Sequence, residues 1–212
     1  MLFVEISAHL ANGDLQSAER AVEAALEKDP GAPDLLGIAT QAFMAYKCYT
    51  NALITINQEL NVSPTNYVAL VNKGYVCIWL RAYQQAIPPL TRVLEMDPNN
   101  HSALLNRAIA YLRSEQLDAA QSDYQVLQKA FPASYQVDYG LQDIAYQKKD
   151  TNAAIRYCQM YLGKAPTNSA EAKIVSARLK ELKSNSPASE EPAKDGGRRV
   201  SNGPKESKPG SP

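Results

Sequence analysis

Residues 67–100 decide the fold, and they read YVALVNKGYVCIWLRAYQQAIPPLTRVLEMDPNN. A short turn near Arg81 and Ala82 separates two stretches, and Pro98 stops the second stretch because proline lacks an N–H and disfavours helix at the preceding residue. Both stretches carry small or apolar residues at the spacing of one helix face: Leu70, Gly74 and Cys77 in the first, and Ala86, Leu90, Val93 and Leu94 in the second. The stretch therefore predicts a pair of helices.

The same pattern recurs five times at a fixed interval. Prolines stand 34 residues apart, and an alanine stands twelve residues before each of them: Pro30, Pro64, Pro98, Pro132 and Pro166, with Ala18, Ala52, Ala86, Ala120 and Ala154. Two residues after four of the prolines comes a residue that favours the helix N-cap: Asn66, Asn100, Ser134 and Asn168. A period of this length predicts stacked units, each of which buries its apolar face against its neighbours.

This pattern resembles that of tetratricopeptide-repeat proteins over residues 1–168. Further columns agree with the resemblance: Leu2, Leu36, Leu70 and Leu104; Leu15, Tyr49, Tyr83 and Leu117; Val22, Ile56, Leu90 and Tyr124. The resemblance implies an all-α, right-handed superhelical solenoid of five helix-turn-helix repeats, at 1–32, 33–66, 67–100, 101–134 and 135–168.

The two ends of the chain differ from the repeats. Residues 169–184 carry one apolar stripe and predict a capping helix, which completes a repeat domain over 1–184: Ala172, Val175, Leu179 and Leu182. Residues 185–212 are rich in Ser, Pro, Gly and charge, and predict a disordered tail. At the other end, the apolar segment Met1–Ile6 has little polar cover, so we expect either a longer natural chain or a surface that packs on a partner or a second copy.

Some positions depart from the pattern. Asp138 replaces the leucine of the first column in the fifth repeat, and Thr151 replaces its Tyr or Leu. Pro88 and Pro89 lie inside the second helix of the third repeat and remove two N–H donors. They predict a kink or a late start of that helix.

Composition excludes several classes of function. Lys and Arg together number 22, as do Asp and Glu, so no long-range field attracts nucleic acid. No apolar run reaches the roughly 20 residues of a membrane-spanning helix, and the start lacks a basic signal-peptide region. Cys48, Cys77 and Cys158 have no metal-ligand spacing. We therefore expect a cytoplasmic protein with neither nucleic-acid binding nor membrane insertion.

Catalytic chemistry is also unexpected. His9 falls in a column shared with Phe43, Cys77 and Tyr111, where a core residue is expected, and His101 begins a helix and should be exposed. The sequence contains no HExxH, glycine-rich phosphate loop or Ser/His/Asp set. It predicts no enzyme activity, no cofactor and no metal.

The resemblance implies that the first helix of each repeat lines a concave surface where a peptide or partner helix lies. The inward positions form an apolar and aromatic floor, which predicts a binding surface for another protein: Val71, Asn72, Tyr75, Trp79, Leu105, Asn106, Ile109, Arg113, Tyr139 and Tyr146. Some of these side chains could instead pack between helices as core.

Asn72 and Asn106 occupy equivalent places in successive repeats. An amide side chain can donate to and accept from a peptide backbone, and the pair resembles the short asparagine ladder by which some family members hold extended chains. Alternatively, each asparagine bridges adjacent helices.

These features predict a non-catalytic scaffold or adaptor that binds an extended or helical apolar segment in its concave groove. Two alternatives stay open. One is a structural assembly component that docks or self-associates through Met1–Ile6, and the other is a secretion-type chaperone for apolar client segments.

Overall fold

The computed structural model describes residues 1–29 and 33–185, which form eleven α-helices and no strand. Ten of the helices make five antiparallel pairs: α1 (Leu2–Ala11) with α2 (Leu15–Lys28), α3 (Pro33–Ala45) with α4 (Tyr49–Val62), α5 (Tyr67–Trp79) with α6 (Tyr83–Met96), α7 (His101–Arg113) with α8 (Leu117–Ala130), and α9 (Tyr135–Gln147) with α10 (Thr151–Lys164). The last helix, α11 (Ala170–Asn185), packs on α10.

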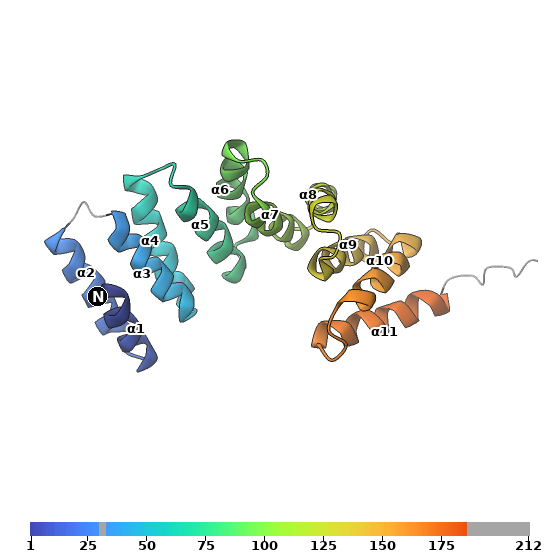
Figure 1. Ribbon diagram of the computed structural model, residues 1–212, viewed down its shortest axis with the longest axis horizontal. Helices are drawn as coiled ribbons and strands as arrows, with labels where there is room; N and C mark the ends of the chain where they lie inside the picture. The colour runs from blue at the N-terminus through green and yellow to red at the C-terminus, as the bar shows by residue number, and fades with distance from the viewer. Residues whose placement is uncertain (30–32, 186–212) are drawn as a thin grey trace, which may run out of the picture.

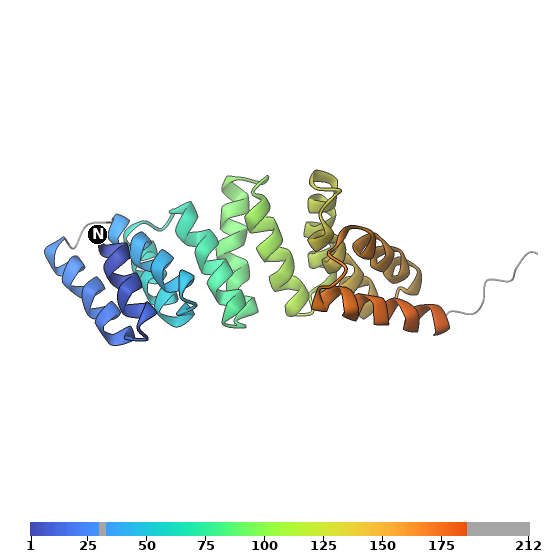
Figure 2. The same cartoon turned by 60° about the horizontal axis from the view of Figure 1, so that its bottom comes forward.

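The helices form an elongated array, with the N-terminus at one end and α11 at the other (Figures 1 and 2). Each pair contacts the pairs before and after it, as a solenoid requires. The predicted all-α, right-handed superhelical solenoid of five pairs and a final helix is confirmed.

Each pair turns through the same backbone geometry. The turn residue has a positive φ in every pair, and only the first is a glycine: Gly13, Lys47, Arg81, Glu115 and Lys149. The next N–H then bonds to the carbonyl five residues back, as in Ala82 N to Cys77 O at 2.8 Å. This is a Schellman motif, which satisfies carbonyls at the end of the first helix.

Side-chain caps begin several helices where the sequence predicted them. Asn66, Asn100 and Ser134 accept from backbone N–H groups in the first turns of α5, α7 and α9. The prediction was wrong at Asn168. There the Ser169 Oγ accepts from the Ala172 N–H at 3.0 Å, because α11 begins one residue later in the repeat register than α9 does.

The prolines of the third repeat do not delay its second helix. The helix α6 runs from Tyr83 to Met96 with Pro88 and Pro89 inside it, and it begins at the register position where α4 and α8 begin. The expected late start is therefore wrong. Pro89 is buried, so it replaces a core side chain, whereas Pro88 is exposed.

The core is a row of three clusters rather than one centre. The first joins α1 to α5, the second joins α5 to α9, and the third joins the last helices around Cys158, Tyr161 and Val175. Gly74 lets α5 approach α6, because a Cβ there would lie 2.4 Å from the Leu90 Cγ. A Cβ at Gly140 would likewise lie 2.2 Å from the Tyr124 ring.

Ion pairs compensate the polar residues of the last repeat. The buried Asp138 carboxylate accepts from the Lys164 Nζ at 2.6 Å, and this explains how an acid occupies a leucine column. The Arg178 guanidinium of α11 donates to Asp143 at 3.0 Å and to Gln142 at 2.9 Å on α9. Two of the cap residues predicted to form an apolar stripe, Ala172 and Val175, are buried.

The division into a repeat domain at 1–184 and a tail at 185–212 stays a prediction. Asn185 closes α11, and the rest of the tail lies outside the described residues.

Candidate functional site: a neutral concave groove

A hollow of about 570 Å³ opens on the side of the array formed by the first helices. Its lining comes from α3, α5 and α7: Gln41, Met44, Ala45, Val68, Val71, Asn72, Tyr75, Ser102 and Asn106. The helices α5 and α7 pack directly on each other, and Phe43 of α3 shares a core cluster with Val76 of α5 beneath the hollow. The hollow therefore spans three successive first helices, and none of its lining residues is charged.

Four of the ten predicted site residues, Val71, Asn72, Tyr75 and Asn106, line this hollow. Asn72 and Asn106 are half-buried, and neither makes a side-chain hydrogen bond within the described residues. By contrast Asn51, Asn66 and Asn100 each donate to a side chain. The helix-bridging bonds considered as the alternative for Asn72 and Asn106 are thus not present in this part of the chain, and both amide groups face the hollow unpaired.

An aromatic cluster continues the hollow toward the helix turns. The Trp79 ring stacks on Tyr49 of α4, with centroids 5.5 Å apart, and meets the edge of Tyr75 at 6.0 Å. Trp79 nevertheless remains 55% exposed. Burial raises the pKa of the Tyr49 phenol, with smaller contributions from Tyr75, so this hydroxyl stays protonated at neutral pH. The cluster offers a neutral aromatic platform.

Leu105 and Ile109 of α7 are neither fully buried nor fully exposed. Both are partly buried against the middle core cluster, as is Val71. Leu105 lies on the far side of α7 from α5, because it lines a different pocket between α7, α8 and α9. These residues therefore act mainly as core packing beneath the floor of the groove.

The remaining predicted residues lie toward α11. Arg113, at the end of α7, is 47% exposed and lies 3.8 Å from Asp143. The guanidinium of Arg178 covers the Tyr146 ring at 4.0 Å, and the Tyr139 ring packs on Tyr161 at 5.4 Å. The structure therefore does not bring Tyr139 and Tyr146 together with the hollow at α3, α5 and α7.

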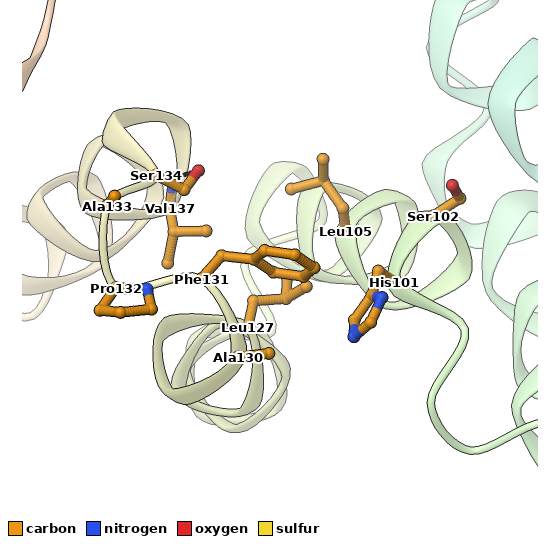
Figure 3. A pocket seen from close by; sticks show the side chains of 10 residues that line it. All are labelled: His101, Ser102, Leu105, Leu127, Ala130, Phe131, Pro132, Ala133, Ser134 and Val137. Atoms are coloured by element: carbon orange, nitrogen blue, oxygen red, sulfur yellow. Dashed lines mark hydrogen bonds between the residues drawn. The ribbon is translucent and has the colours of Figure 1, made fainter.

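Sequence reasoning missed a second apolar pocket, of about 500 Å³, which lies where the loop from α8 to α9 meets the start of α7 (Figure 3). Its ring pair is His101 and Phe131, with centroids 4.4 Å apart and planes at 80°. Tyrosines occupy the place of His101 in the neighbouring repeats, where Tyr67 accepts from Asn100 and Tyr135 packs on Tyr161. His101 lines the pocket where the neighbouring repeats have tyrosine, and this difference within its column of the repeat alignment is the signal that could have found the pocket.

Metal-ligating and thiol side chains are dispersed over the described residues. No three His, Cys, Asp or Glu side chains gather there as a metal site would need. Burial raises the pKa of the Cys77 and Cys158 thiols, so both stay protonated and unreactive. None of the helices in residues 1–29 and 33–185 has the length and apolar character that a bilayer span requires.

Comparison with known proteins agrees with this architecture. The family profile described as tetratricopeptide repeat matches residues 3–60, 80–135 and 105–169. No curated protein matches the sequence.

Several solved structures share the fold. The chain is 18% identical to YrrB, described as a TPR protein with an unusual peptide-binding site, over 83% of this chain and 88% of YrrB, with a TM-score of 0.68. It is 18% identical to PilW, described as a widely conserved type IV pilus biogenesis factor, over 85% of this chain and 84% of PilW, with a TM-score of 0.68. It is 20% identical to residues 41 to the end of MamA from Desulfovibrio magneticus RS-1, over 87% of this chain and 95% of that one, with a TM-score of 0.64.

Proposed function

The chain belongs to the tetratricopeptide-repeat family, and from that premise we propose that it is a non-catalytic scaffold that holds an apolar segment of another protein in its concave groove. One observation carries the proposal: the hollow of about 570 Å³ between α3, α5 and α7 has an uncharged lining with two amide groups that make no hydrogen bond within residues 1–29 and 33–185. Such a surface suits a peptide whose side chains are apolar and whose backbone needs hydrogen-bond partners.

Each group in the groove has a distinct role in this proposal. Val71, Tyr75 and Trp79 are the apolar anchors, and they supply most of the affinity by burying area. Asn72 and Asn106 bond to the partner backbone, at about 1 kcal/mol for each bond. Leu105 and Ile109 support the floor, Arg113 offers a charge at the rim, and Tyr139 and Tyr146 extend the surface toward α11. The cytoplasmic location stays a prediction.

A pull-down with mass spectrometry tests the proposal. The bait is the wild-type chain, compared with the variant Asn72→Ala/Trp79→Ala/Asn106→Ala at matched helicity. A control variant removes three exposed side chains from the second helices, Gln125→Ala/Val126→Ala/Asn152→Ala. We expect a specific protein that the wild type and the control retain and that the groove variant loses. If the groove variant retains the same proteins, the binding surface lies elsewhere.

The N-terminal helix supports a second candidate function, assembly through α1. Phe3 and Val4 are exposed on this helix, as is Met1 just before it, whereas Ile6 is buried. Light scattering over a range of concentrations would then show a mass that rises in the wild type and not in Phe3→Glu. A monomer at every concentration would exclude self-association through this surface.

A further inference from the structure

We infer that the segment bound in the groove carries acidic residues beside its apolar stretch, and that Arg81 and Arg113 hold those residues at the edge formed by the helix turns. The inference rests on the proposed function and adds the chemistry of the partner. It also adds Arg81, which is not among the groove residues named above.

The two arginines share one hollow. Arg81 lies in the turn between α5 and α6, Arg113 is the last residue of α7, and both line a hollow of about 390 Å³ whose single acidic lining residue is Glu115. Arg81 is exposed and makes no ion pair within the described residues. In the neighbouring turn, Lys47 adds an exposed cation that is also unpaired in this part of the chain. The edge therefore carries positive charge that these residues do not neutralise.

Arg113 is available although it faces Asp143. The Asp143 carboxylate already accepts from the Arg178 guanidinium at 3.0 Å, and Arg113 lies 3.8 Å from its other oxygen. At that separation Arg113 makes no hydrogen bond to Asp143 within the described residues, and nearly half of its side chain is exposed. A carboxylate from a partner can therefore bind Arg113 without leaving Asp143 unpaired.

The edge is continuous with the groove. Tyr75 lines the neutral hollow and also contacts Trp79, which is followed in sequence by the exposed Leu80 and then by Arg81. A chain that lies on Val71 and Tyr75 and leaves past Trp79 reaches the two arginines next. Aromatic and arginine side chains in such proximity are the residue types that dominate binding energy at protein interfaces.

Charge complementarity favours an acidic protein segment over an anionic membrane. Polybasic membrane sites need about four to eight clustered Lys or Arg side chains. This edge offers Lys47, Arg81 and Arg113, with Glu115 among them. It opens from a groove with no charged lining, which fits a chain whose neutral part is followed by a short acidic part.

Selection from a displayed library of random twelve-residue peptides tests the inference. The wild-type chain serves as bait, in parallel with Arg81→Gln/Arg113→Gln and with a control of equal charge change, Arg92→Gln/Lys129→Gln, at exposed positions on the second helices. We expect the wild type and the control to select an apolar run flanked on one side by Asp or Glu. The arginine variant should lose the acidic flank, and it should bind the selected peptides roughly tenfold more weakly in fluorescence anisotropy at low salt.

The possible outcomes separate the two proposals. If the wild type selects apolar peptides without an acidic flank, or if Arg81→Gln/Arg113→Gln keeps the flank, the inference is overturned and the groove proposal stands. If no peptide is selected, both are overturned. If only vesicles rich in phosphatidylserine bind the wild type and lose binding to Arg81→Gln/Arg113→Gln, the edge is a membrane surface and the inference is wrong.

Discussion

At the scale of single residues, Glu59 fits its surroundings least well. It is 5% exposed and occupies a column that is otherwise apolar, and its carboxylate accepts one hydrogen bond, from the Asn66 Nδ2 at 2.8 Å. The other members of the column are Ala25, Val93, Leu127 and Tyr161. Burial raises the pKa of Glu59 above its ordinary value of 4.5, and the charge of Asp34 raises it further. The charged form of Glu59 therefore opposes folding.

This shift predicts how stability depends on pH. A folded-state pKa above the unfolded value gives a stability contribution that is complete below about pH 4.5 and is lost as the pH rises through the raised pKa. Glu59→Gln keeps the oxygen that Asn66 needs and removes the charge. It should raise the unfolding temperature at pH 7 by about 2–4 °C, and the gain should shrink toward pH 4.5. Glu95→Gln, at an exposed position of α6, should show no comparable gain, and an equal gain in both variants would contradict the explanation.

Gly74 provides the second prediction at this scale. A methyl group there would lie within 2.7 Å of three Leu90 carbons, so α5 and α6 would have to separate. Gly74→Ala should lower the free energy of unfolding by about 1–3 kcal/mol. Gly163→Ala is the matched control, because nothing lies within 4 Å of its added methyl group and alanine favours helix. Urea denaturation measures both, and a loss of equal size in the control would show that close packing at Gly74 is not the cause.

At the scale of elements, α11 is held to α9 by a polar contact rather than by its apolar stripe alone. Arg178 donates to Gln142 and Asp143 and covers the Tyr146 ring. Val175 of the same helix packs in the third core cluster. The helix is thus fixed in orientation by one guanidinium that serves three partners on α9.

Removing this guanidinium should loosen the end of the solenoid. Arg178→Met keeps the length of the side chain but leaves the buried Asp143 without its nearer cation, at a cost of about 2 kcal/mol. Because repeats contact only their neighbours, amide exchange should speed up in α11 and α9 and not in α1–α4. Lys180→Met, an exposed change on the same helix, should leave exchange unaltered. Faster exchange spread evenly over the array would contradict this assignment.

At the scale of the whole molecule, the repeat period predicted most of what the structure contains. Residues that recur every 34 positions identify the core face of each helix, since stacked repeats place equivalent residues in equivalent surroundings. The failures occur where one repeat differs from the next. The sequence could show that Asn72 and Asn106 occupy equivalent positions. It could not show that Gly140, in the same column, packs against the Tyr124 ring, because that contact depends on packing between α8 and α9.

The candidate site was predictable only in part for the same reason. The sequence placed Val71, Asn72, Tyr75 and Asn106 on the inward face, and these residues line the hollow. It could not show that the hollow opens between α3, α5 and α7, nor that Arg178 covers Tyr146. Both depend on how helices are offset across repeats, which no column of the alignment records. The positive φ of Lys47, Arg81, Glu115 and Lys149 is equally hidden, because only Gly13 marks that position with a glycine.

The central claim is that the partner lies in the groove between α3, α5 and α7, and photo-crosslinking tests it most directly. Benzoyl-phenylalanine is placed singly at the positions of Tyr75 in the groove, Val126 on α8 and Phe3 on α1, and each chain is irradiated with the protein recovered in the pull-down. We predict crosslinks from position 75 and none from positions 126 and 3. Crosslinks from position 126 or 3 without any from position 75 would contradict the claim and place the binding surface outside the groove.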